Sequence, residues 1–383
     1  MNRNLLLALI FSLMVMSLAQ CTGDPASNPK YFTGVQSTVR AYETRVQASV
    51  SPSPTSSPRP SATPTSTRTP HPTSTPTITP TLLPLGAREI KADNAYALTL
   101  LYNKFTARVL DIAYSPGNTY LAAATEKGVT LFNRFNMQVL SEIDLDQAVQ
   151  EMAFSPDEKQ LAVVGAKDFG VVDVSTGNWV FRSRDDSASA TAYLSSGALV
   201  AFGNTNGEIE IRKPAGDVIA ILGAHQGSVN SLAFSPNRNW LASVSEDKTV
   251  RLWYAQSYTP AGMYPHHVQD VRSLAFSPDS ALLASGSDDD HVMIYRVTAG
   301  GRAADLTFHR GEVYDMAFSP DGNLFFSAAT DMRLCIMDVQ NWKLVHTLVI
   351  KDDPLQSISL SPDGKLVALV GRKGVLQVWG LQN

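Results

Sequence analysis

LAFSP at Leu232–Pro236 is one of seven related five-residue phrases that recur along the chain at a nearly constant interval. The other six are IAYSP at Ile112–Pro116, MAFSP at Met152–Pro156, AYLSS at Ala192–Ser196, LAFSP at Leu274–Pro278, MAFSP at Met316–Pro320 and ISLSP at Ile358–Pro362. Their shared serine falls at positions 115, 155, 195, 235, 277, 319 and 361, so the period is first 40 and then 42 residues. A fixed period of this length indicates one supersecondary unit stacked on its own copies.

One copy of the unit shows which structure the repeat encodes. Val229–Phe234 and Trp240–Val244 are β-prone runs separated by the breaker Ser235-Pro236-Asn237, and Thr249–Trp253 is a third, alternating run after a polar turn. Proline cannot donate to a sheet ladder, so its place after the first run fits a strand end. With a weaker fourth strand, each unit has the size of one propeller blade. The sequence therefore predicts an all-β, seven-bladed β-propeller.

The last repeat lacks an outer strand. Its third strand ends at Val378-Trp379, and only four residues follow. A β-like run at Tyr96–Tyr102 precedes the first repeat and belongs to no blade. Sheets avoid leaving two unpaired edges face to face. We therefore expect this N-terminal run to complete the C-terminal blade and close the ring.

Four polar and aromatic residues of the fourth repeat fall at positions that suit a buried network. They are His225, Ser243, Asp247 and Trp253. A buried indole N–H needs a hydrogen-bond acceptor, and a fully satisfied polar chain makes a blade rigid. The set resembles the His–Ser/Thr–Asp–Trp network of the WD40 repeat family. That resemblance implies a structural network here and a WD40-like propeller.

The next two repeats keep three of the four network residues. They have His267, Ser285 and Asp289 with Tyr295 in place of the indole, then His309, Ser327 and Asp331 with Met337 in that place. The seventh repeat keeps only Trp379, and the first three lack the network. The resemblance therefore rests mainly on period and strand pattern over roughly residues 95–383. Propellers around the periplasmic TolB protein carry similar SPDG turns and are the nearest rival family.

Residues 1–21 have the pattern of a signal peptide. A basic start precedes the apolar run Leu5–Met16, which is too short to span a bilayer. Leu18-Ala19-Gln20-Cys21 is similar to the bacterial lipobox, which implies lipidation of the Cys21 thiol. Gln20 departs from the Gly, Ala or Ser that the pattern prefers. The alternative is a cleaved signal, or a short uncleaved anchor, with an incidental cysteine.

Two further segments separate this signal from the propeller, which we assign to residues 89–383. Residues 22–50 place apolar side chains at helical spacing, which predicts a short juxtamembrane helix or, alternatively, a marginal helix without a specific role. Residues 51–88 form a Pro/Ser/Thr-rich linker, with 10 Pro and 17 Ser/Thr in residues 51–84 alone. At roughly 3.1 Å per residue, such a disordered stalk reaches on the order of 100 Å.

Charge differs between the two parts of the chain. The whole chain has 31 Lys and Arg against 35 Asp and Glu. Residues 1–84 hold six basic and two acidic side chains, so the rest has 25 basic and 33 acidic ones, a net charge of −8. An acidic propeller lacks the basic footprint that phosphate contacts require, which argues against nucleic-acid binding. The basic N-terminal part suits an anionic membrane surface.

Catalytic and metal-binding motifs are missing from the sequence. It contains no phosphate-binding loop, no HExxH and no GxSxG, and its two cysteines, Cys21 and Cys335, make no disulfide framework. His266-His267 with Asp270, and the run Ser287–His291, are conceivable cation sites. Their His267 and Asp289 already fall on network positions, and Asp is common in tight turns. We predict no catalytic residue, no metal site and no cofactor.

Loops before the first strand and between the second and third strands gather on one face of a propeller, around the central channel. On this face we predict a partner-binding set of Glu246, Asp270, Arg272, Asp288, Glu312, Tyr314 and Arg372. Arg and Tyr are enriched in binding hot spots. The four acidic members would form an acidic arc over repeats four to six. Alternatively, these residues are ordinary solvated loop charges.

These observations predict a membrane-tethered, extracytoplasmic propeller on a bacterial cell surface or periplasmic face. We expect it to be a monomer that contacts the membrane through its lipid anchor and serves as a non-catalytic platform for a protein partner. The alternative is an extracytoplasmic carbohydrate-binding propeller or enzyme with its site in the central channel. Aromatic rings beside paired carboxylates in that channel would favour the alternative, because the fold alone does not decide function.

Overall fold

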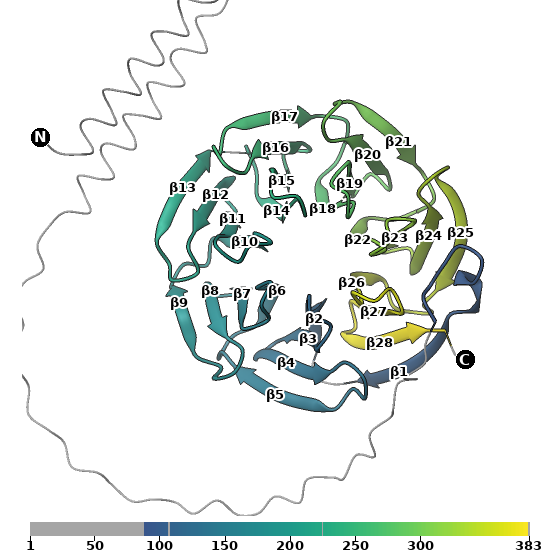
Figure 1. The fold of residues 1–383 in the computed structure, drawn as a ribbon, viewed down its shortest axis with the longest axis horizontal. Helices are drawn as coiled ribbons and strands as arrows, with labels where there is room; N and C mark the ends of the chain where they lie inside the picture. The colour runs from purple at the N-terminus through teal and green to yellow at the C-terminus, as the bar shows by residue number, and fades with distance from the viewer. Residues whose placement is uncertain (1–87, 106–107, 224, 382–383) are drawn as a thin grey trace, which may run out of the picture. The chain divides into compact units, whose positions relative to one another are not determined.

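The computed structural model describes residues 88–105, 108–223 and 225–381. These residues form seven four-stranded antiparallel sheets arranged as a ring around a central channel (Figure 1). The predicted all-β, seven-bladed propeller is therefore confirmed. The predicted signal peptide (1–21), the segment 22–50 and all but the last residue of the linker 51–88 lie outside the described residues.

Each of the first six blades uses four consecutive strands, ordered from the channel to the rim. Blades 1 and 2 comprise β2 (Val109–Tyr114), β3 (Tyr120–Thr125), β4 (Gly128–Asn133), β5 (Val139–Asp144), β6 (Val149–Phe154), β7 (Gln160–Gly165), β8 (Phe169–Asp173) and β9 (Trp179–Ser183). Blades 3 and 4 comprise β10 (Ala188–Tyr193), β11 (Val200–Asn204), β12 (Glu208–Arg212), β13 (Val218–Gly223), β14 (Val229–Phe234), β15 (Trp240–Ser245), β16 (Val250–Tyr254) and β17 (Pro260–Tyr264).

Blade 7 differs from the others because its outer strand comes from the other end of the chain. Blades 5 and 6 comprise β18 (Val271–Phe276), β19 (Leu282–Ser287), β20 (Val292–Arg296), β21 (Arg302–Leu306), β22 (Val313–Phe318), β23 (Leu324–Ala329), β24 (Arg333–Asp338) and β25 (Lys343–Val349). Blade 7 comprises β26 (Leu355–Leu360), β27 (Leu366–Gly371) and β28 (Val375–Gly380), with β1 (Thr99–Phe105) at the rim. β1 pairs antiparallel with β28, so the predicted closure of the ring by an N-terminal strand is confirmed (Figure 1).

The closing strand starts later than predicted. Its predicted first residues lie in η1, a single 3-10 turn over Ala95–Ala97, and the strand begins at Thr99. Ala95, the first residue of this turn, is completely buried. An extended backbone here would move Ala95 out of the core. No helix in the part of the chain that the structure describes has the length and apolar character needed to cross a membrane.

Residues 88–98, which include η1, are fixed to blades 6 and 7, and we call them the N-terminal latch. Ile90, Ala95 and Leu98 are buried in the apolar core between these two blades. The Ile90 N–H donates to the Gly364 carbonyl in the turn between β26 and β27. The latch therefore lies on the face of the ring that carries these turns.

The recurring Ser-Pro phrase forms the turn between the first and second strands of each blade. In blade 6 the Ser319 hydroxyl donates to Asp321 Oδ1 at 2.6 Å and accepts the Leu324 N–H at 2.8 Å. Gly322 has a φ of 74°, a left-handed conformation that glycine adopts without strain. The phrase is therefore a structural turn, and its seven copies mark one face of the ring, the Ser-Pro face.

The apolar core lies between the blades. Seven clusters of buried side chains each join two neighbouring blades, and the cluster between blades 7 and 1 joins the two ends of the chain. Second strands such as β23 are buried along their whole length because both faces of the sheet are covered. The repeats thus stabilise one another in a closed circle.

A β-bulge interrupts the pairing of the first and second strands at the same place in every blade. In blade 1 the register shifts between Val109 and Asp111, and the other six blades shift at the corresponding residues. A bulge re-aims the side chains around it. As a result, the two residues after the first position of the inner strand both line the channel in six of the seven blades.

Candidate functional site

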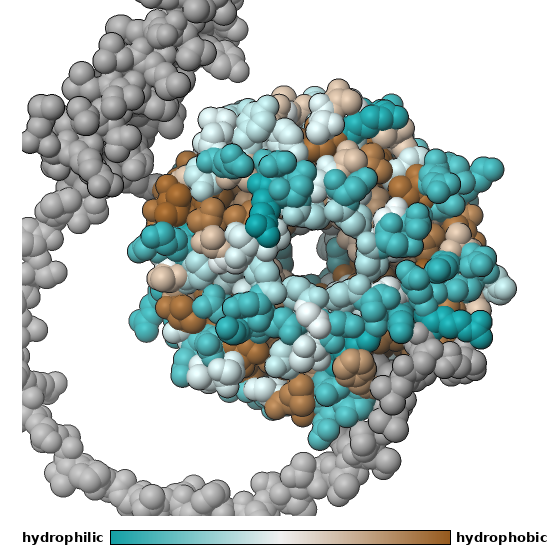
Figure 2. Space-filling model, in the orientation of Figure 1, coloured by the Kyte–Doolittle hydropathy of each residue, from teal (hydrophilic) through white to brown (hydrophobic). Residues whose placement is uncertain are grey.

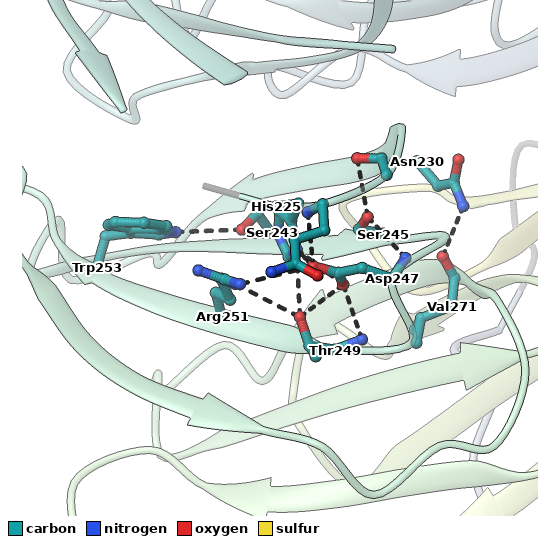
Figure 3. A network of polar contacts seen from close by, with 11 residues as sticks. His225, Asn230, Ser243, Ser245, Asp247, Thr249, Arg251, Trp253 and Val271 are labelled. Atoms are coloured by element: carbon teal, nitrogen blue, oxygen red, sulfur yellow. Dashed lines mark hydrogen bonds and ion pairs between the residues drawn. The ribbon is translucent and has the colours of Figure 1, made fainter. Parts of the chain in front are cut away.

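The predicted network of blade 4 comes together as a continuous chain of hydrogen bonds (Figure 3). His225 Nε2 lies 2.8 Å from Ser243 Oγ, and its Nδ1 lies 2.9 Å from Asp247 Oδ2. The Trp253 indole N–H donates to the same Ser243 hydroxyl at 3.1 Å. Burial lowers the pKa of His225 to about 4 despite the Asp247 charge, so its imidazole is neutral at physiological pH.

Blades 5 and 6 hold the same histidine, serine and aspartate in contact. His267 Nε2 lies 2.7 Å from Ser285 Oγ, and its Nδ1 lies 3.0 Å from Asp289 Oδ2. Burial alone would raise the pKa of Asp289, but hydrogen bonds from His267 and the Val268 N–H outweigh it and lower the pKa to about 2.

In blade 6 the corresponding contacts join His309, Ser327 and Asp331. At the tryptophan position of these two blades, Tyr295 and Met337 are buried. All ten network residues therefore connect strands within a blade, and nothing in their geometry directs them toward a ligand.

The predicted partner-binding set lies on the opposite face from the Ser-Pro turns, and we call this the loop face. Within it, Arg272 at the start of β18 binds both neighbouring carboxylates. Its Nη2 lies 2.6 Å from Asp288 Oδ2 and 3.2 Å from Asp270 Oδ2. The hydrogen bonds to Asp288 raise the pKa of Arg272, so its charge is permanent.

A second cluster joins blades 6 and 7 on the loop face. Arg372, between β27 and β28, donates to Glu312 Oε2 at 2.8 Å. Its guanidinium lies over the Tyr314 ring, 4.9 Å from the centroid, as in a cation–π contact. Two arginines and one tyrosine are thereby held in place around the mouth of the channel.

These ion pairs change the expected charge of the loop face. Of the predicted acidic arc of Glu246, Asp270, Asp288 and Glu312, the last three form ion pairs with Arg272 and Arg372, so two of the four negative charges are offset. Glu246 is exposed in the turn between β15 and β16, and no ion pair to it is found among the described residues. The face presents compact charge pairs instead of one sign of charge.

The central channel opens between these clusters and has a volume of about 450 Å³. Figure 2 shows it as a hole through the middle of the ring, surrounded by hydrophilic residues. Side chains at its wall bridge neighbouring inner strands: Asn230 donates to the Val271 carbonyl at 2.9 Å, and Gln356 donates to the Leu110 carbonyl at 2.7 Å. The wall thus connects the blades around the ring.

Three carboxyl groups in this wall were missed by the sequence analysis: Asp111, Glu151 and Asp315. Each accepts a backbone N–H from the next blade, from Met152 at 3.0 Å for Asp111 and from Ile358 at 2.8 Å for Asp315. Glu151 accepts the Thr191 N–H at 3.3 Å. These three hydrogen bonds therefore join blade 1 to blade 2, blade 2 to blade 3, and blade 6 to blade 7.

Burial against the inner strands makes these three groups weak acids. It raises the pKa of Asp111 to about 6 and that of Asp315 to about 7, although both accept backbone hydrogen bonds that oppose the rise. Burial, followed by repulsion from Asp111, also raises the pKa of Glu151 well above its usual value. Each keeps some exposed surface, which faces the channel.

The position of these carboxyl groups explains why they were missed. Each follows directly after a residue that the repeat alignment places at the channel, such as Tyr314 before Asp315. In a regular strand the next side chain would point to the other face, but the shared bulge turns it along the channel wall. The sequence would have predicted these channel carboxyl groups only if the bulge could be recognised in the repeat.

The described residues offer no group of three or more His, Cys, Asp and Glu side chains that could hold a metal ion. Of the conceivable cation sites, the pair His266-His267 is split, since His267 belongs to the network while the His266 ring packs at a tilt against Tyr295. In the run Ser287–His291, Asp288 binds Arg272. These side chains are therefore engaged in structural contacts.

Comparison with known proteins agrees with this geometry. The family model of the WD domain, G-beta repeat, matches residues 216–254, 258–296 and 301–338. The model of the anaphase-promoting complex subunit 4 WD40 domain matches residues 112–193. These matches cover blades 1 to 6 in part and include the three blades with the His–Ser–Asp network.

Several curated proteins are similar over shorter stretches. Histone acetyltransferase type B subunit 2 of Candida glabrata is 25% identical over 168 residues, 38% of this chain and 40% of that protein. The probable cytosolic iron-sulfur protein assembly protein 1 of Mycosarcoma maydis is 30% identical over 122 residues, 32% and 25% of the two chains. The serine-threonine kinase receptor-associated protein of Gallus gallus is 24% identical over 150 residues, 39% and 43%.

The chain spans less than half the length of these relatives. WD40 propellers of this kind generally serve as protein-interaction scaffolds. The repeat matches and the seven closed blades together show that this chain belongs to the WD40-repeat β-propeller family.

Proposed function

We propose that this chain is a membrane-tethered, extracytoplasmic WD40 propeller that serves as a non-catalytic platform for a protein partner. The observation that carries the proposal is the pair of ordered clusters at the channel mouth. Arg272 is held by Asp270 and Asp288, and Arg372 is held by Glu312 over the Tyr314 ring. We call these two clusters together the channel-mouth clusters.

Ordering favours the clusters as a binding surface. Association loses affinity when long side chains must be immobilised, and here the two arginines are already fixed in the free protein. Arginine and tyrosine are enriched among the residues that dominate binding energy. The paired charges suit a partner surface with both signs of charge, whereas a nucleic acid would need uncompensated basic groups.

The channel carboxyl groups give the alternative proposal some support. A carbohydrate-binding or catalytic channel would use carboxyl groups beside aromatic rings, and Asp111, Glu151 and Asp315 line the channel. They are committed to backbone N–H groups of neighbouring blades, and the aromatic ring at the wall, Tyr314, is covered by Arg372. We therefore prefer the platform, with an oligosaccharide ligand in the channel as the second candidate.

A photo-crosslinking experiment tests the platform. A photoreactive residue replaces the exposed Glu246 on the loop face or, as a matched control, the exposed Lys159 on the Ser-Pro face. In intact cells we expect position 246 to yield an adduct with one protein and position 159 to yield none. Adding Arg272→Glu and Arg372→Glu should lower the adduct more than tenfold, because each removes a hot-spot side chain.

Two results would contradict the platform: equal adducts at both positions, or an adduct that survives both arginine substitutions. Adduct formation that is lost when an oligosaccharide is added, but not in the arginine variants, would favour the second candidate.

The membrane tether rests on the lipobox-like sequence that ends at Cys21, outside the described residues. In cells fed a labelled fatty acid, we expect the parent chain to be labelled and Cys21→Ser to remain unlabelled, because the thiol is the acceptor atom. Cys335 is buried and serves as the internal control, since it remains in both chains. Equal labelling of the two chains would remove the lipid anchor from the proposal.

A further inference from the structure

The outer strands of the blades present seven free sheet edges at the rim of the ring. Each outer strand pairs with its own blade on one side and with no described strand on the other. A free edge exposes a row of unpaired backbone N–H and C=O groups, which can pair with another chain. Soluble proteins protect such edges with charged residues or proline.

Six of the seven outer strands have such residues in their sequences. They are Lys104 in β1, Glu142 and Asp144 in β5, Arg182 in β9, Pro260 in β17, Arg302 and Asp305 in β21, and Lys343 and His346 in β25. β13 of blade 3, with the sequence VIAILG over Val218–Gly223, has no charged residue, no histidine and no proline. Among the described outer strands, β13 is therefore the one unprotected edge.

β13 is also apolar on its exposed surface. Val218, Ile219 and Ile221 keep between 39% and 47% of their surface exposed, which is high for β-branched side chains. Exposed Val180 on β9 and Met263 on β17 extend the apolar rim to both neighbouring blades. Figure 2 shows hydrophobic residues gathered at the left edge of the ring, where Figure 1 places β13.

We propose that β13 is a dimerisation edge, on which β13 of a second copy of this chain pairs antiparallel to form one eight-stranded sheet across two propellers. An edge without charge is best matched by another edge without charge, and β13 itself is the surface with that chemistry among the described residues. A two-fold axis through the middle of the strand makes the contact self-complementary. The proposal replaces the monomer expected from the sequence.

The two-fold axis requires each register to be centred on a residue, because residues on the same face must lie opposite one another. Two such registers are centred near the middle of the strand. One register is centred on Ala220 and places Ile219 beside Ile221 of the second copy. The other is centred on Ile221 and places the two Ile221 side chains side by side. In both, isoleucines pack across the new edge, and no charged residue of either strand faces another.

We expect the dimer to be weak in dilute solution. Two paired strands with their flanking apolar side chains bury less than the roughly 1,200 Å² that specific stable interfaces need. The dissociation constant should therefore be on the order of micromolar or higher. Confinement of two copies to one membrane surface would raise their effective concentration and favour the dimer.

Cysteine cross-linking in the full chain tests this proposal. In both registers the two Ile221 side chains lie within roughly 8 Å, so Ile221→Cys should be joined to itself by a short bismaleimide. Leu140→Cys is the matched control, because Leu140 lies on the charged outer strand β5 and is at least as exposed as Ile221. Both variants carry Cys21→Ser, which leaves the buried Cys335 as the native thiol.

We expect a cross-linked homodimer from Ile221→Cys that is at least tenfold more abundant than from Leu140→Cys, and its loss when Ile219→Lys is added. Unchanged thermal unfolding of the Ile219→Lys chain shows that the loss comes from the edge and not from misfolding. Equal cross-linking of the two cysteine variants would overturn the proposal. So would a product in which Ile221→Cys is joined to a different protein, since the edge would then accept another partner.

Discussion

Deletion of residues 90–103 should abolish the single cooperative unfolding transition of the propeller. The deletion removes most of β1, leaves β28 with an unpaired edge and takes Ile90, Ala95 and Leu98 out of the core between blades 6 and 7. A large apolar side chain contributes about 1.5–3 kcal/mol when buried. The total loss therefore approaches the roughly 5–15 kcal/mol that stabilises a whole domain.

The measurement is thermal or denaturant unfolding followed by two probes. We expect non-coincident, broadened transitions for the shortened chain and one sharp transition for the parent. Deletion of residues 51–64, an equally long stretch of the Pro/Ser/Thr-rich segment, is the control and should leave the transition unchanged. If the chain without residues 90–103 unfolds like the parent, ring closure by β1 does not stabilise the propeller.

The second large effect is a loss of stability as the pH rises from 5 to 8, caused by the channel carboxyl groups. The folded-state pKa values of Asp111 and Asp315 are raised to about 6 and about 7. A raised folded-state pKa means that the folded protein binds protons more tightly than the unfolded chain. The stabilisation is therefore complete below pH 4 and disappears as the pH rises through 6 and 7.

A variant carrying Asp111→Asn and Asp315→Asn isolates this effect. Two histidines also contribute to the pH dependence of stability, because the folded-state pKa of His225 is lowered to about 4 and that of His309 is raised to about 9. The quantity to measure is therefore the difference in unfolding free energy between the parent and the variant. A pKa unit corresponds to about 1.4 kcal/mol, so with allowance for exposure to the channel this difference should fall by on the order of 2–4 kcal/mol between pH 5 and 8.

Urea titrations at pH 5, 6, 7 and 8 provide the free energies. Asp217→Asn serves as the control, because Asp217 is an exposed carboxylate that pairs with Lys213 and lies outside the channel, so this substitution should leave the pH dependence of the parent intact. A constant or widening difference between parent and channel variant would show that the carboxyl groups are ionised without penalty in the folded protein.

The blades and their closure could be predicted because they follow from local pattern and from counting. Each Ser-Pro phrase ends an inner strand, and the missing outer strand of the last repeat matched the surplus run near Thr99. The first residue of that strand could not be predicted. Ala95 and its neighbours are apolar enough for a strand, and only packing on blade 6 selects the turn.

The site was predicted less completely, because its chemistry depends on contacts across blades. The residues of the loop face were identified by their position in the repeat, but their charge state was not. Arg372 and Glu312 are 60 residues apart and meet only because blades 6 and 7 are neighbours in the ring. Asp315 was missed because an inner-strand bulge, which no residue type in the repeat marks, turns it toward the channel.

The N-terminal latch has a mechanical consequence. A pull on the chain ahead of Arg88 reaches the propeller first at the Ile90 N–H bond to Gly364 and at the buried side chains of Ile90, Ala95 and Leu98. The β1–β28 seam that closes the ring comes later along the line of force. In a protein held by its N-terminal end, the latch therefore bears the load and shields the seam from shear.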